Sequence, residues 1–178
     1  LVTGGSGFIG GHLVRKLLNE TNSLIFNIDK LSYASDDESI NKLNESKNRY
    51  FLYKINLKDS QSISKAIQES KPDLIFHLAA ETHVDRSIDS PMIFLETNVL
   101  GTFNILQAAL NYFQTLSTLK KNNFRFHHVS TDEVFGSLNK TGKFDEKTKY
   151  DPRSPYSASK ASSDHIVRAW FHSYKLPI

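Results

Sequence analysis

A tyrosine and a lysine four positions apart, Tyr156 and Lys160, have the residue types and the spacing of an acid–base pair. Residues i and i+4 share one face of a helix, and these two stand at the start of a helical pattern. Because a neighbouring ammonium group favours a phenolate, we expect Lys160 to lower the pKa of Tyr156 and to make it a usable base. A second match, Tyr50 and Lys54, lies in a strand pattern, where four residues span about 13 Å, so we interpret it as structural.

A hydroxyl group and two carboxylates, those of Thr131, Asp132 and Glu133, follow a short apolar run. Adjacent carboxylates at the end of a buried strand are costly unless water solvates them or a reaction uses them. A solvated turn is the plain alternative. A simple dehydrogenase needs only the tyrosine, the lysine and a hydroxyl group, so the added carboxylates suggest further proton transfers.

Half of the eight glycines fall within seven positions, among them Gly4, Gly7 and Gly10. They stand between a strand pattern and a helix pattern, where bare backbone can approach a pyrophosphate at the helix N-terminus. A glycine turn without a ligand is the alternative, but the order of elements is the one that a dinucleotide site requires. Asp29 ends the next strand pattern, where a carboxylate binds ribose hydroxyls and repels a 2′-phosphate. We therefore expect NAD rather than NADP, although Lys30 weakens this preference.

The elements that would position these residues alternate between strand and helix. Helical spacing covers residues 7–20, 60–70, 91–117 and 156–174, and short apolar runs at 1–3, 24–28, 50–55, 74–78 and 125–130 indicate strands. A helix without an assigned range is allowed between the second and third strands. This alternation predicts an α/β domain with a doubly wound parallel sheet and helices on both faces. The chemistry is expected at the carboxyl ends of the strands, near the switch point.

The composition argues against several other classes of protein. A formal net charge of +3, spread along 178 residues, is atypical of nucleic-acid binding. The chain has no cysteine, which excludes a disulfide scaffold and a cysteine nucleophile, and its seven histidines lack ligand spacing, so we expect no metal site. The longest apolar runs, such as 74–80, are too short for a membrane span, and no signal peptide is recognised; we expect a cytoplasmic protein.

Six segments together resemble the extended short-chain dehydrogenase/reductase superfamily and, within it, nucleotide-sugar 4,6-dehydratases of the dTDP-glucose 4,6-dehydratase type. They are TGGSGFIGGHLV, NIDKLSYA, HLAAETHVDRSI, ETNVLGT, FHHVSTDEVFG and SPYSASKASSDHIVRAW. The segment STDEVFG distinguishes the dehydratases from related epimerases and decarboxylases, because those enzymes lack its Asp–Glu pair. The resemblance implies a Rossmann fold and an NAD-dependent lyase of deoxysugar biosynthesis. Such a lyase oxidises dTDP-glucose at C4, removes water across C5–C6 and returns hydride to C6. A UDP-glucose dehydratase, or an epimerase or decarboxylase of the same fold, is the alternative.

The resemblance also implies roles for individual residues. NAD would contact Gly4, Gly7, Phe8, Ile9, Gly10, Asp29, Lys30, Leu31, Ser32, Asn56, Leu57, Leu78, Ala79, Ala80, Thr82, Thr97, Tyr156 and Lys160, with Asn56 at a position that usually carries Asp. The sugar would contact Thr82, Thr131, Asp132, Glu133 and Tyr156. The catalytic set would be Thr131, Asp132, Glu133, Tyr156 and Lys160. In that set Tyr156 would take the 4-hydroxyl proton, Glu133 would take the C5 proton, and Asp132 would protonate the departing hydroxyl.

The ends and the helices suggest what else the whole protein contains. We expect residues 1–178 to be an NAD-binding Rossmann domain truncated at both ends, with a substrate domain beyond residue 178. The helical patterns at 91–117 and 156–174 are apolar around much of their surface, and the resemblance implies a homodimer built on these two helices. The rival from another class is an NAD-sensing protein without catalysis. Such proteins lose the Tyr–Lys pair, which this chain keeps.

Overall fold

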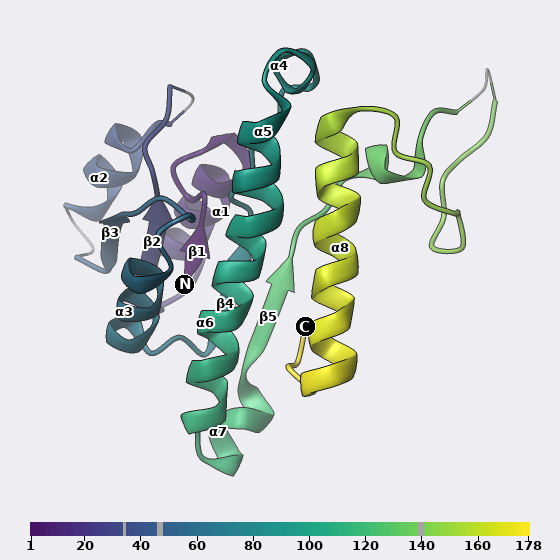
Figure 1. Cartoon of the computed structure of the whole chain (residues 1–178). Helices are drawn as coiled ribbons and strands as arrows, with labels where there is room; N and C mark the ends of the chain where they lie inside the picture. The colour runs from purple at the N-terminus through teal and green to yellow at the C-terminus, as the bar shows by residue number, and fades with distance from the viewer. Residues whose placement is uncertain (34, 46–47, 139–140) are drawn as a thin grey trace.

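A computed structural model describes residues 1–33, 35–45, 48–138 and 141–178 of the chain. Within these residues, five parallel strands form one sheet in the order β3-β2-β1-β4-β5 (Figure 1). The strands are β1 (Val2–Thr3), β2 (Ile25–Asp29), β3 (Tyr50–Lys54), β4 (Leu74–His77) and β5 (Arg125–His128). The strand order reverses between β1 and β4, which is the switch point of a doubly wound sheet. The predicted Rossmann-type fold is therefore confirmed.

Helices cover both faces of the sheet, each over its own apolar cluster. One cluster joins Val14 and Leu18 to Val2 and Ile25 and lies under α1 (Phe8–Glu20) and α2 (Glu38–Asn44). The other joins Ile63 and Ile105 to residues of β4 and β5 and lies under α3 (Ser60–Ser70), α6 (Gly101–Thr115) and α8 (Pro155–Tyr174). Figure 1 shows α6 and α8 side by side over β4 and β5. The helices on both faces leave the carboxyl ends of the strands accessible.

The helix predicted over residues 91–117 is not regular. It consists of α5 (Pro91–Phe94), a π-helical segment η1 (Leu95–Leu100) and α6, and a separate helix α7 (Thr118–Asn123) follows. A π-helical turn shifts the backbone hydrogen bonds by one residue and is frequently found at functional sites. Apolar spacing does not reveal it, because the helix axis continues through η1. Two further elements were not predicted, α4 (Val84–Asp89) and the 3₁₀ turn η2 (Asp132–Phe135).

The continuous helical run Pro91–Thr115 is long and apolar enough to cross a membrane by length and composition. Its uninterrupted apolar runs are short, as expected from the sequence, but the polar residues between them do not end the helix. Its most apolar window is 56% buried inside the protein. Ile105, Leu106 and Ala109 contact the core there and are fully buried. A core helix of a folded domain has the same properties.

The helix that carries Tyr156 and Lys160 starts at a capping box. The Ser154 hydroxyl accepts a hydrogen bond from the Ser157 amide at 3.0 Å, and the Ser157 hydroxyl accepts one from the Ser154 amide at 2.9 Å. Pro155 occupies the first helical position, where its missing N–H group costs nothing. The cap thus fixes Tyr156 in the first turn of α8 and Lys160 one turn later.

Candidate active site

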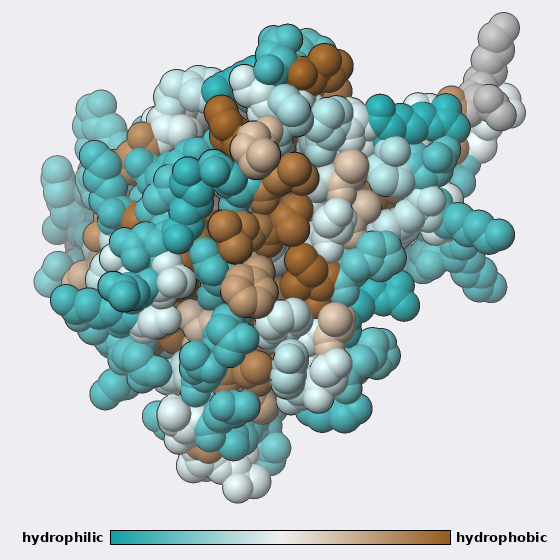
Figure 2. Space-filling view, viewed as in Figure 1, coloured by the Kyte–Doolittle hydropathy of each residue, from teal (hydrophilic) through white to brown (hydrophobic). Residues whose placement is uncertain are grey.

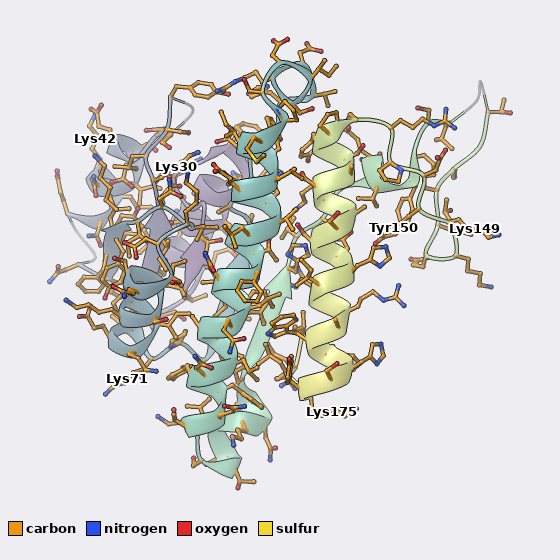
Figure 3. The ribbon with its side chains drawn as sticks, viewed as in Figure 1. Lys30, Lys42, Lys71, Lys149, Tyr150 and Lys175 are labelled. Atoms are coloured by element: carbon orange, nitrogen blue, oxygen red, sulfur yellow. The ribbon has the colours of Figure 1, made fainter. Side chains whose placement is uncertain are left out.

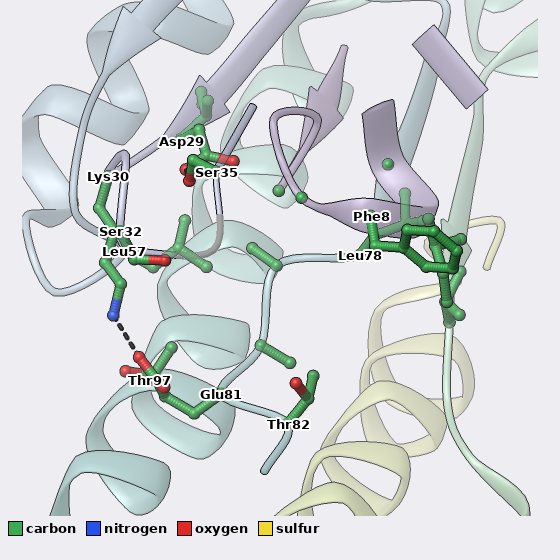
Figure 4. A pocket seen from close by; sticks show the side chains of 18 of the residues that line it. Phe8, Asp29, Lys30, Ser32, Ser35, Leu57, Leu78, Glu81, Thr82 and Thr97 are labelled. Carbon is green, nitrogen blue, oxygen red and sulfur yellow. Dashed lines mark hydrogen bonds and ion pairs between the residues drawn. The ribbon is translucent and has the colours of Figure 1, made fainter. Parts of the chain in front are cut away.

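A cleft of about 470 Å³ opens at the carboxyl ends of the strands, at the switch point. Its walls come from the glycine-rich loop, from the segments that follow β2, β3, β4 and β5, and from η1 and α8. Of the residues assigned to NAD from the sequence, all except Leu31 line this cleft. Figure 4 shows Phe8, Asp29, Lys30, Leu78 and Thr97 around it. The fold therefore brings together side chains that lie far apart in the sequence.

The glycine-rich loop has no room for a side chain at Gly4 or Gly10. A Cβ atom on Gly10 would lie 2.1 Å from the carbonyl oxygen of Gly4, and one on Gly4 would lie 2.7 Å from the Cα atom of Ala79. Gly4 also has a φ of +72°, which favours glycine. Phe8 and Ile9, the first residues of α1, are 93% and 65% exposed although they are apolar. A helix N-terminus with bare backbone beside it is an anion site.

Asp29 connects the glycine-rich loop to the end of β2. Its carboxylate accepts hydrogen bonds from the backbone amides of Ser6 at 3.0 Å and Leu31 at 2.8 Å, and from the Ser35 hydroxyl at 3.4 Å. Leu31 has a φ of +56° and contributes its amide to Asp29, while its side chain does not line the cleft. A carboxylate has about four acceptor positions, so Asp29 retains capacity for a ribose hydroxyl.

Tyr156 is buried in the wall of the cleft, and its pKa is raised above the ordinary value of 10. Burial is the largest cause, because it disfavours the phenolate. A hydrogen bond from the Thr131 hydroxyl acts in the opposite direction, and the negative charges of Glu133 and Asp132 raise the pKa further. Thr131 therefore bonds to the phenol, while the two carboxylates act on it through their charge from η2, which packs against α8.

The pKa of Tyr156 is raised in the free protein although Lys160 lies one helical turn away, so the expected lowered pKa is not met there. The ammonium group of Lys160 donates a hydrogen bond to the backbone carbonyl of Val129 at 2.7 Å. Burial lowers the pKa of Lys160, and the negative charge of Asp164 partly opposes this. The two residues share the face of α8 that the i, i+4 spacing predicts, but the ammonium group is directed at the end of β5.

The carboxylate pair lies in a turn beyond β5 rather than in the strand. Thr131 caps the 3₁₀ turn η2, and its hydroxyl accepts a hydrogen bond from the Glu133 amide at 3.3 Å. Asp132 is exposed and Glu133 is half-buried. Neither they nor Thr131 belong to the cleft lining, which ends at Ser130, but both charges act on Tyr156. The pair therefore lies beside the phenol at the rim of the cleft.

Asn98 is a buried site residue that was not singled out from the sequence. Its side chain exchanges two hydrogen bonds with the backbone of Glu81, at 2.8 and 3.0 Å, and donates a third to the Ser159 hydroxyl at 2.8 Å. The Ser163 hydroxyl in turn donates to the carbonyl of Asn98 at 2.6 Å. Asn98 thus connects η1 to the segment after β4 and to α8. A buried amide within an apolar helical pattern is the signal that could have found it.

A second buried carboxylate, that of Asp164, holds the end of β5 against α8. It accepts hydrogen bonds from the hydroxyl groups of Ser130 at 2.6 Å and Tyr150 at 2.9 Å, and His128 Nε2 lies 3.0 Å away. Figure 3 shows the Tyr150 side chain beside α8. Burial alone would raise the pKa of Asp164, but the hydrogen bonds from His128, Ser130 and Tyr150 together hold it below the ordinary value. This network positions the turn that carries Thr131.

The sequence was compared with those of known proteins. The whole chain, residues 1–178, matches the family described as GDP-mannose 4,6 dehydratase. The dTDP-glucose 4,6-dehydratase of Salmonella typhimurium is 50% identical in an alignment of 186 positions, gaps included. The alignment covers 99% of this chain and 51% of that protein. The corresponding protein of Haemophilus influenzae is 48% identical and covers 100% of this chain and 53% of its own length. The chain therefore spans about half the length of the curated relatives it matches.

Solved structures share the fold. The crystal structure of DesIV (dTDP-glucose 4,6-dehydratase) from Streptomyces venezuelae, which contains NAD, has a TM-score of 0.86 at 37% identity and covers 98% of this chain and 52% of its own. The UDP-Glc/GlcNAc 4-epimerase from Campylobacter jejuni has a TM-score of 0.84 at 26% identity, with coverage of 98% and 50%. The fold thus serves different reactions. Because the family match runs over its full length, the chain belongs to the GDP-mannose 4,6 dehydratase family.

Proposed function

We propose that the full-length protein that contains this chain is a dTDP-glucose 4,6-dehydratase. The observation that carries this proposal is that η2, which holds Asp132 and Glu133, packs against α8, so that both negative charges act on Tyr156. Oxidation at C4 needs one base, whereas removal of water across C5 and C6 needs a second base and an acid. The turn after β5 offers both groups within reach of the phenol. Identities of 50% and 48% to curated dTDP-glucose 4,6-dehydratases support the choice of reaction and substrate.

The cleft fits a dinucleotide such as NAD. The pyrophosphate would lie on the glycine-rich loop at the N-terminus of α1, and Asp29 would bind the adenosine ribose. The nicotinamide would lie along Leu78, Ala79, Ala80, Thr82 and Thr97, near Tyr156 and Lys160. When bound, NAD would accept hydride from C4 of the sugar and return it to C6, and its positive charge would lower the pKa of Tyr156. Solved relatives of both the dehydratase and the epimerase type contain NAD, which supports this assignment.

Tyr156 would take the proton of the 4-hydroxyl group of the sugar. Its raised pKa means that the free protein holds the phenol protonated, so the base forms only when other charges enter the cleft. The Thr131 hydroxyl already favours the phenolate by hydrogen bonding and would share the bond to the 4-hydroxyl group. Lys160 would keep a positive charge one helical turn away and hold the end of β5 in place.

Glu133 would remove the proton at C5, which becomes acidic only after C4 is a ketone. Asp132 would protonate the C6 hydroxyl group as it leaves. The exposure of Asp132 lets this carboxyl group exchange protons with water, whereas Glu133 is half-buried, as suits a base near the sugar ring. The two adjacent carboxylates therefore divide the acid and base roles of the elimination.

We propose that a substrate domain outside residues 1–178 binds the nucleotide, because the curated relatives are about twice as long as this chain. The choice between dTDP and UDP would be made in that domain. The same fold carries UDP-sugar epimerases, so a UDP-glucose dehydratase or an epimerase is the second candidate. The Asp132–Glu133 pair favours the dehydratase.

We also propose that the protein is a homodimer. Figure 2 shows apolar side chains gathered along α5, η1 and α6. Among them Ile93, Leu100 and Phe103 are 42%, 46% and 39% exposed, and Phe171 on the neighbouring helix α8 is 47% exposed. An exposed apolar strip over two adjacent helices is typical of a protein–protein interface. A two-fold axis through this strip would bury it against a second copy of itself.

The mass of the product tests the proposed function. The full-length protein, incubated with NAD and dTDP-glucose, should give a product that is lighter by one water molecule. A product of unchanged mass would instead show an epimerase, and the absence of any product with bound NAD would favour an NAD-sensing protein. A parallel incubation with UDP-glucose, compared with the one with dTDP-glucose, shows which of the two nucleotides the protein accepts.

A further inference from the structure

Lys30 and Glu81 form an ion pair across one wall of the cleft (Figure 4). Lys30 follows β2 and Glu81 follows β4, so the pair connects two segments 51 residues apart. The Lys30 side chain is 35% exposed and the Glu81 side chain 12% exposed, so the carboxylate is the more buried partner. Both residues line the cleft.

Lys30 is a cation in the cleft lining that directly follows Asp29, the residue proposed to bind the adenosine ribose. Among the cleft-lining residues that the structure describes, the lysines are Lys30 and Lys160, and Lys160 is bonded to Val129 beside β5. A carboxylate at the position of Asp29 repels a 2′-phosphate, whereas a free cation beside it attracts one. The selectivity therefore depends on whether the charge of Lys30 is available.

Glu81 is a fixed anion, while Lys30 has a flexible stem. The amide and the carbonyl of Glu81 are both bonded to the side chain of Asn98, at 2.8 and 3.0 Å. Asn98 is itself buried and bonded to Ser159 on α8. The backbone that carries Glu81 is thus held by η1, which is itself bonded to α8, so the Glu81 carboxylate stays on this wall and keeps its ion pair with Lys30.

We propose that Glu81 determines the specificity for the cofactor by neutralising Lys30, so that the cleft accepts a dinucleotide without a 2′-phosphate. This inference rests on the proposed NAD site and adds the residue that selects between NAD and NADP there. Asp29 supplies repulsion, and Glu81 removes the attraction that the charge of Lys30 would otherwise offer. The partner of Lys30, rather than Lys30 itself, then sets the selectivity.

Binding of NAD and NADP to the full-length protein, measured by titration calorimetry, tests the inference apart from turnover. Glu81→Gln keeps the shape and frees the charge of Lys30, so NADP should bind about tenfold more tightly, while NAD binding changes by less than about twofold. Glu96→Gln is the matched control. It removes the same charge from the Lys58–Glu96 pair, in which the atoms lie 2.9 Å apart and which does not line the cleft, so both affinities should stay unchanged.

The double variant Lys30→Gln/Glu81→Gln leaves no charge in the pair and should bind NADP as weakly as the unmodified protein. It keeps the inference testable if Glu81→Gln alone does not fold. No gain for NADP in Glu81→Gln, an equal gain in Glu96→Gln, or clearly weaker NADP binding by the double variant than by the unmodified protein would overturn the inference. Failure of the unmodified protein to bind NAD would instead contradict the proposed function.

Discussion

The ammonium nitrogen of Lys160 lies 2.7 Å from the carbonyl oxygen of Val129 and donates a hydrogen bond to it. This bond fastens α8 to the residue after β5, two positions before Thr131. The hydrogen bond leaves the positive charge of Lys160 in place. In the free protein, burial and the charges of Glu133 and Asp132 nevertheless raise the pKa of Tyr156. The structure thus separates two roles of Lys160, fixing the strand end and supplying charge to the site.

Thr131→Val should move the pH profile of the reaction upward. The change removes the hydrogen bond that lowers the pKa of Tyr156, and a base with a higher pKa is deprotonated only at higher pH. We expect the ascending limb of kcat/KM to shift by about one pH unit, with roughly tenfold lower activity below it. Thr131→Ser keeps the hydroxyl and should keep the profile. An unshifted limb in Thr131→Val would remove Thr131 from control of the base.

Glu133→Gln should separate oxidation from elimination. Loss of a positioned general base costs about 10²–10⁴ in rate, so overall turnover should fall by that order, while oxidation at C4 continues. Loss of the negative charge should also lower the pKa of Tyr156. The ascending limb of the pH profile for C4 oxidation should then move to lower pH. Exchange of the C5 hydrogen in heavy water, followed by mass spectrometry, should nearly stop. Near-normal exchange would mean that another group is the base.

Asp164→Asn should destabilise the protein. Three side chains donate to this buried carboxylate, and hydrogen bonds to a charged group are worth about 1.5–3 kcal/mol each, so partial loss should lower the free energy of unfolding by roughly 2–3 kcal/mol at neutral pH. Urea unfolding of the full-length protein measures this. Asp89→Asn, at an exposed carboxylate on α4, is the control and should change little.

The pH dependence of that stability has a defined sign. The folded pKa of Asp164 lies below its ordinary value of 3.8, so its contribution is complete above that value and is lost as the pH falls toward the folded pKa. Asp164→Asn should therefore lose most stability near neutral pH, and the difference from the unmodified protein should shrink below about pH 4. An equal difference at all pH values would show that the charge of Asp164 contributes nothing.

Phe103→Glu should break the proposed homodimer. A carboxylate in the apolar strip would be buried without a partner across the two-fold axis, which is strongly unfavourable. Light scattering at micromolar concentration should give the monomer mass for this variant and the dimer mass for the unmodified protein. Leu119→Glu on α7 changes another exposed apolar residue, outside the strip, and should leave the dimer intact. A monomeric unmodified protein would contradict the proposal.

Sequence patterns predicted the sheet and the residues directly after its strands. Asp29, Tyr156 and Lys160 were found because strand ends and helix starts are set by local signals, such as a capping serine and a proline at the first turn. The sheet then brings all strand ends to one edge, so residues at those positions meet. For this reason seventeen of the eighteen residues assigned to NAD, all but Leu31, line the cleft.

Pairings between distant segments could not be predicted in the same way. The partner of Lys30 is 51 positions away, and nothing local distinguishes Glu81 from other acids. The π-helical segment that places Asn98 leaves the apolar spacing intact, because only the backbone bonds change. The direction of the Lys160 ammonium group depends on the Val129 carbonyl, which only the folded sheet brings near. These features depend on tertiary contacts rather than on residue order.

The fate of a deuterium label at C4 of dTDP-glucose tests the central claim most directly. The full-length protein would be incubated with the labelled sugar in ordinary water, and the product analysed by mass spectrometry and NMR. A 4,6-dehydratase should give a 4-keto-6-deoxy sugar, lighter by one water molecule, in which the deuterium has moved to C6. A product of unchanged mass that carries the label at C4 would show that the protein oxidises and reduces the same carbon, and would contradict the proposed dehydratase.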